Sequence, residues 1–159
     1  MAGGLQYGRG KSIHLCTMRR LLLLASLICV TAGKAPTVRS EPEFVIVVNE
    51  SNPAAALPAS EVAQLFLKKK TKWPSGANVV PVDQQPGHTR EAFSREVLGR
   101  DISAVRAYWQ QQIFSGRSTA PEEKPSDAAV IAFVKESPGG IGYVSASAAT
   151  TGVKILPTR

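Results

Sequence analysis

The run Phe44-Val45-Ile46-Val47-Val48 constrains the fold more than any other stretch of this chain. Its β-branched residues favour an extended strand, and no polar residue alternates with them. A strand of this kind is covered on both of its faces rather than on one. Turn-forming residues then end the strand at 49–53. The run therefore predicts a layered domain in which other elements pack on each side of a sheet.

Helical patterns alternate with further strand-like runs along the rest of the chain. Strands are predicted at 79–82, 141–144 and 153–156. Helices are expected to start at Pro58 or Ser60, at Thr89 as an N-cap, at Asp101 or Ser103, and at Ser126. This alternation predicts an α/β fold, a single three-layer lobe with a mixed, mostly parallel sheet and helices on its faces.

Two stretches have both a structural and a functional interpretation. The third helix carries a row of aromatic and aliphatic residues at near-helical spacing, namely Val105, Tyr108, Trp109, Ile113 and Phe114. We expect this row to lie in the core, and the alternative is a platform for a ligand. Lys68, Lys69, Lys70 and Lys72 follow the first helix, where cations complement its dipole. The alternative for these lysines is a docking patch or a site for an anionic membrane.

The N-terminus has the form of a secretory signal. Met18-Arg19-Arg20 precedes an apolar run of twelve residues, and small residues follow up to a predicted cleavage near Ala32. We therefore expect an N-terminal extension plus signal peptide at 1–35 with a start at Met18, a flexible lead-in at 36–43, and a folded domain at 44–157. Export to the periplasm is the expected localisation. A retained membrane anchor is the alternative, although twelve apolar residues are few for a bilayer span.

Composition narrows the range of possible functions further. The net charge of +7 falls to +3 from Lys34 onward, where 15 basic residues face 12 acidic ones, so no nucleic-acid partner is expected. Cys16 and Cys29 both lie in the predicted signal segment, and His88 is the one histidine after it. No Walker, dinucleotide-binding, zinc-protease or serine-hydrolase motif occurs. We therefore predict no enzyme activity, no metal and no cofactor; a hydrolase centred on His88 is the third hypothesis.

The stretch from Val79 to Leu98 is the expected functional site. A strand that passes through the loop Pro86-Gly87-His88 into a helix gathers free backbone N–H groups and the positive end of the helix dipole, which suits an anion. Arg90 in the first turn would oppose the dipole unless a negative group is near. The alternative is that Arg90 pairs with Glu91, Glu96 or a distant carboxylate. The helix start at Ser126 is a second candidate, with simple capping as its alternative.

With these residues in view, the chain resembles the phosphate ABC transporter substrate-binding proteins, a family of type 2 periplasmic binding proteins, as a short single-lobe member. The resemblance rests on VIVVNESNP at 45–53, SEVAQLFLKKKTKWPSG at 60–76, VVPVDQQPGHTREAF at 79–93, SDAAVIAFV at 126–134 and SPGGIGYVSAS at 137–147. The stretches occur in the same order as in the family, and the resemblance covers roughly 44–156, nearly all of the chain after the predicted signal peptide. The resemblance implies the fold of one lobe of such a protein.

The resemblance also implies the ligand and its contacts. The family's serine-glycine-threonine-arginine loop corresponds to Gly87, His88, Thr89 and Arg90, so the serine hydroxyl is missing here, and a family glycine is replaced within Lys68-Lys69-Lys70. We expect weak, non-enzymatic binding of phosphate or a similar oxyanion at these four residues, assisted by Ser126 and Tyr143. The alternative is an envelope protein–protein interaction module with a vestigial site, partnered by an envelope or transporter protein or by a second copy that completes the half-cleft.

Overall fold

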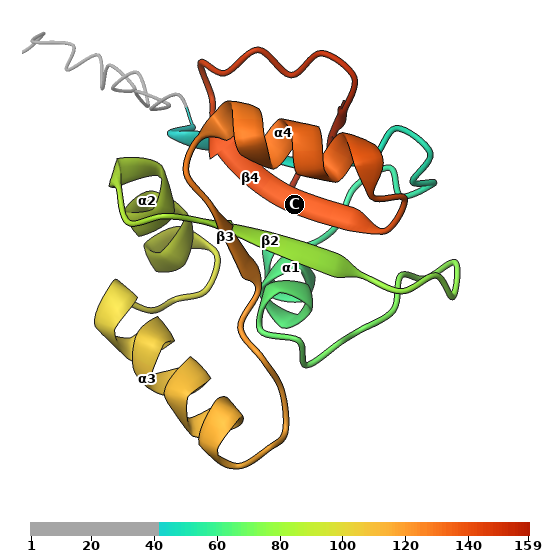
Figure 1. Cartoon of the computed structure of the whole chain (residues 1–159). Coiled ribbons are helices and arrows are strands. Elements are labelled where there is room, and N and C mark those ends of the chain that lie inside the picture. The colour runs from blue at the N-terminus through green and yellow to red at the C-terminus, as the bar shows by residue number, and fades with distance from the viewer. Residues whose placement is uncertain (1–41) are drawn as a thin grey trace, which may run out of the picture. The chain divides into compact units, whose positions relative to one another are not determined.

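The computed structural model describes residues 42–159, in which five strands and four helices follow one another (Figure 1). The elements in chain order are β1 (Phe44–Val48), α1 (Ala59–Phe66), β2 (Val80–Gln84), α2 (His88–Glu96), α3 (Ile102–Phe114), β3 (Glu122–Lys124), α4 (Asp127–Glu136), β4 (Gly140–Ser145) and β5 (Lys154–Ile155). The predicted signal peptide, its cleavage near Ala32 and the alternative anchor fall on residues 1–41, outside the described part. None of the helices within 42–159 has the length and apolarity that a bilayer span requires.

The sheet is mixed and has the strand order β3-β2-β4-β1-β5. β2 runs parallel to both β3 and β4, whereas β1 runs antiparallel to both β4 and β5. The α/β fold and the mixed sheet confirm the prediction, although parallel and antiparallel pairings are equal in number among the described strands. The parallel part lies at β3-β2-β4, and the loops that leave β2 and β3 therefore open at the same edge of the sheet.

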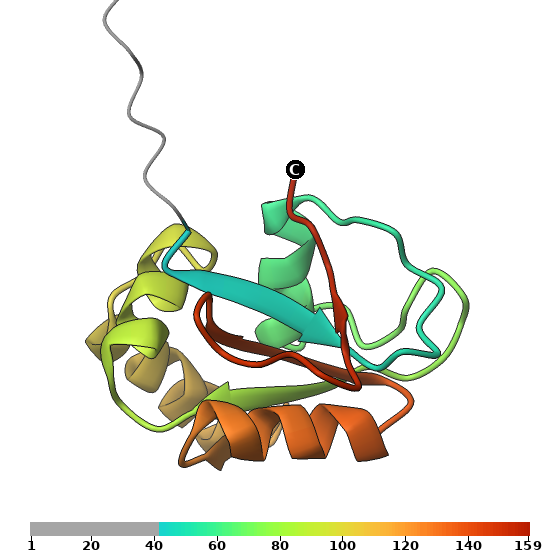
Figure 2. The same cartoon turned by 90° about the horizontal axis from the view of Figure 1, so that it is seen from above.

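Helices cover both faces of the sheet, as the β1 sequence predicts. Figure 2 shows α4 on one face and α1 with α2 on the other. The α4 face is packed by buried valines, and a Cβ placed on Gly142 of β4 would lie only 2.6 Å from Val130 Cγ1 and 2.9 Å from Val82 Cγ1. A residue without a side chain at 142 therefore allows α4 to approach the sheet closely.

An aromatic cluster on the other face fixes the position of α2. Phe93 of α2 stacks on Tyr143 of β4 with ring centroids 3.9 Å apart and lies 4.6 Å from Phe66 of α1. Phe44 of β1 meets Phe93 edge to face at 5.6 Å. Rings from four elements thus hold the helix that follows the predicted ligand loop, and each ring pair adds about 1 kcal/mol beyond its burial.

Two local predictions were wrong. No strand was predicted between the third helix and Ser126, but Glu122–Lys124 pair with β2 as a strand. The row on α3 is only partly core: Val105 and Trp109 are buried, whereas Ile113 is 53% exposed and Phe114 is 90% exposed. Both residues stand at the C-terminal end of α3, where more than half of each is accessible to solvent.

Candidate functional site

The predicted site lies where β2 ends and α2 begins. The connecting loop is held to the neighbouring strand because Gln85 N donates to Lys124 O at 2.9 Å. Since β2 and β3 are parallel, the helices that follow them, α2 and α4, both start at this edge of the sheet. The topology thus brings together the two helix starts that the sequence marked as anion-site candidates.

The first turn of α2 contains backbone amides that make no hydrogen bond within 42–159. Gly87 is the N-cap residue and has no side chain with which to cap, so the prediction that Thr89 caps the helix was wrong. Glu91 N makes the first helical bond, to Gly87 O at 3.0 Å. The amides of His88, Thr89 and Arg90 have no acceptor among the described residues. Gly87 and His88 are exposed, so a small anion has open access to this turn.

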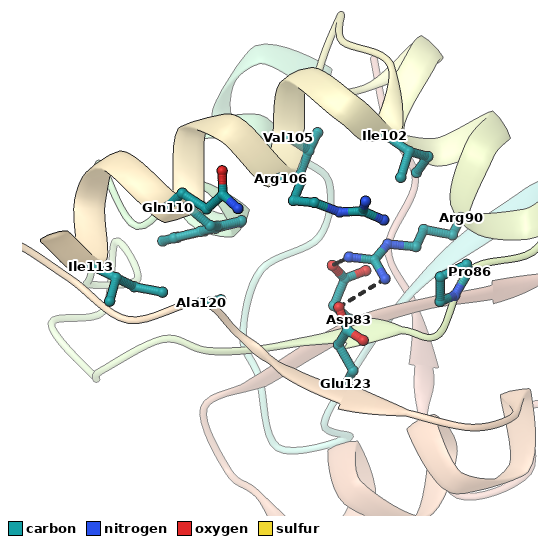
Figure 3. Close-up of a pocket in the computed structure, with 11 residues that line it drawn as sticks. Asp83, Pro86, Arg90, Ile102, Val105, Arg106, Gln110, Ile113, Ala120 and Glu123 are labelled. Carbon is teal, nitrogen blue, oxygen red and sulfur yellow. Dashed lines mark hydrogen bonds and ion pairs between the residues drawn. The ribbon is translucent and has the colours of Figure 1, made fainter.

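Arg90 points away from this open turn into a buried ion-pair cluster (Figure 3). Its guanidinium contacts Asp83 Oδ2 at 2.9 Å through Nη2 and Glu123 Oε1 at 2.8 Å through Nη1. Only 8% of Arg90 is exposed, and its Nε has no hydrogen-bond partner. The structure therefore agrees with the alternative that Arg90 pairs with distant carboxylates, and two such groups offset its charge next to the helix dipole.

Asp83 links this cluster to the aromatic core. Its Oδ1 accepts a hydrogen bond from the Tyr143 hydroxyl and another from Gln84 N at 2.8 Å. Burial raises the pKa of the Asp83 carboxyl, while the bond from Tyr143 and the charge of Arg90 oppose that rise. Burial and the neighbouring Asp83 charge also raise the pKa of the Tyr143 hydroxyl, which keeps it a donor. Asp83, Arg90 and Tyr143 thus form one connected polar unit beneath α2.

A second set of hydrogen bonds fixes the start of α4. Gln84 Nε2 donates to Asp127 Oδ1 at 2.6 Å and to Tyr143 O at 2.9 Å, and Ser145 N donates to the same Asp127 oxygen at 3.2 Å. Ser126 Oγ accepts from Ala129 N at 3.3 Å, which is the capping interaction that the sequence offered as the alternative for this position. The start of α4 is therefore already occupied by groups of the chain itself.

The six predicted ligand-binding residues thus divide into three sets. Gly87, His88 and Thr89 surround the open turn of α2; Arg90 and Tyr143 lie buried beneath it; Ser126 caps α4. Sequence reasoning missed Glu123 and Gln84 as site residues. Glu123 lies on the strand that the sequence did not predict, and its distance of 33 residues from Arg90 left no local signal.

The described residues contain no cluster of metal-ligating side chains. Across 42–159, histidine, aspartate and glutamate nowhere gather in a group of three that could hold a metal ion. Asp83 and Glu123 are both engaged by Arg90, and Glu43 lies 3.9 Å from His88 Nε2. What the described geometry offers chemically is a cluster of main-chain donors at the start of α2.

Comparisons with known proteins give a likeness in structure. No protein-family model matches the chain, and no curated protein matches its sequence. Among solved structures, the chain is similar to a protein from Clostridium perfringens described as a phosphate ABC transporter substrate-binding protein with bound phosphate, at 19% identity and a TM-score of 0.56. That match covers 72% of this chain and 44% of the other.

A second solved structure gives the same result. An ABC-type phosphate transport receptor from Vibrio cholerae matches at 18% identity and a TM-score of 0.56, over 72% of this chain and 45% of that one. At such identity the likeness shows the fold alone. The described chain therefore has the fold of about one lobe of phosphate-transport binding proteins, as the resemblance in sequence implied, and spans less than half the length of the two relatives.

Proposed function

We propose that this chain is an exported, non-enzymatic solute-binding lobe that binds phosphate or a similar oxyanion weakly at the start of α2. One observation carries the proposal: the amides of His88, Thr89 and Arg90 are unpaired at an exposed helix start that follows a sheet strand. The fold likeness supports it, since one similar structure holds bound phosphate. Helix starts of this kind favour anions because N–H groups and the dipole converge there.

The proposed contacts follow from the geometry of the turn. Gly87 places no side chain over the amides, and the half-buried Thr89 lies in the same turn with a hydroxyl as a further donor. Arg90 and Tyr143 act as positioning residues, because their polar groups hold Asp83 rather than solvent. Ser126 holds the neighbouring helix start in place through its cap.

Weak affinity is expected for two physical reasons. The site is open on one side, and charge-assisted contacts lose strength where water has access. The only arginine in the turn is offset by Asp83 and Glu123, so little net positive charge remains for an anion. We expect a dissociation constant of about 1 mM, corresponding to about 4 kcal/mol of binding free energy.

A proline substitution tests the main-chain site directly. His88 is the first residue of α2, where proline is tolerated because its missing N–H makes no helical bond. In calorimetry with phosphate and sulfate at low salt, we expect His88→Pro to weaken binding about tenfold, the worth of one charge-assisted hydrogen bond. The matched variant His88→Ala retains the amide and is expected to bind as the original chain does.

Either of two outcomes would end the proposal. One is the absence of any heat of binding at millimolar phosphate and sulfate. The other is equal binding by His88→Pro and the original chain, provided that both have the same helix content. The export part is tested separately, because N-terminal sequencing of the exported protein should show a start near Gly33.

A second candidate function is that of an envelope protein–protein interaction module, and one observation favours it. Phe114 is 90% exposed beside Ile113, which is an unusual exposure for two adjacent large apolar side chains. A transporter or envelope protein, or a second copy of the chain, is the expected partner. Sedimentation and envelope pull-downs that lose a complex in Phe114→Ser would support this role, and a monomer without partners would exclude it.

A further inference from the structure

A cavity lies beside the Arg90 cluster, between α3 and the β2-β3 edge of the sheet (Figure 3). Its volume is about 350 Å³, which is within the range of sites for small organic molecules. It is separate from the open turn of α2, because neither Gly87, His88 nor Thr89 lines it. Its walls combine an apolar surface with charged groups at one end.

The apolar wall comes from one stripe of α3. Ile102, Val105, Trp109 and Ile113 recur at helical spacing and all line the cavity. Trp109 is 7% exposed and Ile113 is 53% exposed, so part of this stripe remains uncovered by the described chain. The row that the sequence marked as core, with a ligand platform as its alternative, thus forms the wall of a cavity.

The charged end contains two arginines that converge. Figure 3 shows the side chain of Arg106 extending from α3 toward the guanidinium of Arg90. Arg90 is offset by Asp83 and Glu123. Arg106 has no such partner, since no carboxylate within 42–159 lies at ion-pair distance from it. A carboxylate placed beside Arg106 would supply the ion-pair partner that this arginine lacks among the described residues.

We propose that this cavity binds a small organic carboxylate with an apolar or aromatic body. The carboxylate pairs with the fork of Arg106, a geometry that guanidinium matches well. The body lies against Trp109 and removes exposed apolar surface of Ile113 from water. Inorganic phosphate gains nothing from that wall, so the inference goes beyond the proposed oxyanion function and concerns a different set of residues.

Phenylacetate is a suitable probe, because it joins a carboxylate to an aromatic ring. In NMR titrations of the isotope-labelled full chain, the indole N–H signal of Trp109 is expected to shift and saturate at millimolar phenylacetate. Arg106→Gln should weaken binding about tenfold, the effect of losing a charge-assisted pair. Ile113→Ser should weaken it about threefold. Arg117→Gln removes an exposed arginine outside the cavity and should leave the affinity unchanged.

The neutral analogue phenylethanol completes the test, and we expect it to bind about tenfold more weakly than phenylacetate. Three results would overturn the inference: no saturable shift at Trp109, unchanged affinity in Arg106→Gln, or equal binding of phenylethanol. Arg106 is exposed, so its variant should fold, and the dispersion of its amide spectrum verifies this. Phosphate binding is read at His88 instead, so either proposal can fail while the other stands.

Discussion

Replacement of Arg90 by methionine tests whether this arginine is a buried structural cation or an anion ligand. Methionine keeps much of the apolar stem and removes the guanidinium. Asp83, which is 9% exposed, then loses its cationic partner but keeps the donors Tyr143 and Gln84 N. Breaking a buried pair costs 3 to 5 kcal/mol, and the two remaining donors place the expected loss at about 3 kcal/mol.

The exposed partner of the same arginine provides the control. The Glu123 side chain is 46% exposed, so Glu123→Gln should cost about 0.5 kcal/mol, as exposed pairs do. Equilibrium urea unfolding at about pH 7 measures both values from the midpoint and the slope. The two substitutions therefore remove opposite sides of one ion-pair cluster with clearly different expected losses.

The pH dependence gives an independent test. Burial raises the Asp83 pKa in the fold above its ordinary value of 3.8, so the folded state binds this proton more tightly than the unfolded state. Its contribution to stability is present below 3.8 and is lost as pH rises through the raised pKa. Arg90→Met removes one effect that opposes the rise, so the deficit of the variant should grow from acid to neutral pH. A loss below about 1 kcal/mol at neutral pH, or a deficit that shrinks there, would refute the buried pair.

Three further substitutions test the backbone and the packing of the fold. Lys68 has a positive φ of 51°, which glycine adopts more readily than lysine does. Lys68→Gly should therefore stabilise the chain by about 0.5 kcal/mol in thermal unfolding, even though it loses the bond to Thr119, whereas the control Lys69→Gly should destabilise the chain. Gly142→Ala should lower the free energy of urea unfolding by about 2 kcal/mol, because the new Cβ meets valines of β2 and α4; a loss near zero would show that α4 can move away. Tyr143→Phe keeps the ring stack and removes a donor from Asp83, so it should cost about 1 to 2 kcal/mol, and an unchanged stability would argue against that bond.

Local chemistry explains how much of the fold the sequence could predict. The β-branched run of β1, the Asp101 cap of α3 and the Ser126 cap of α4 are each determined within a few residues, and all three occur as predicted. β3 was missed because Glu122–Lys124 has no apolar pattern, and pairing with β2 alone makes it a strand. Element type could therefore be predicted wherever side-chain pattern and backbone preference agreed.

The position of the site could be predicted from the sequence, but the contacts of its side chains could be predicted only in part. The loop from strand to helix at 86–90 was recognisable from Gly87 and the helical pattern after it. The ion pairs of Arg90 could not be recognised, because Asp83 lies on the preceding strand and Glu123 on a strand far along the chain. Side-chain pairing across a sheet depends on topology, and no local pattern around Arg90 encodes it.

An amide-resolved NMR titration of the full chain with inorganic phosphate at low salt tests the proposed function most directly. We expect saturable shifts that are largest at the amides of His88, Thr89 and Arg90, with a dissociation constant of about 1 mM and with about tenfold weaker binding in His88→Pro. Shifts that never saturate, or that centre on Lys68-Lys69-Lys70 instead of the start of α2, would contradict it.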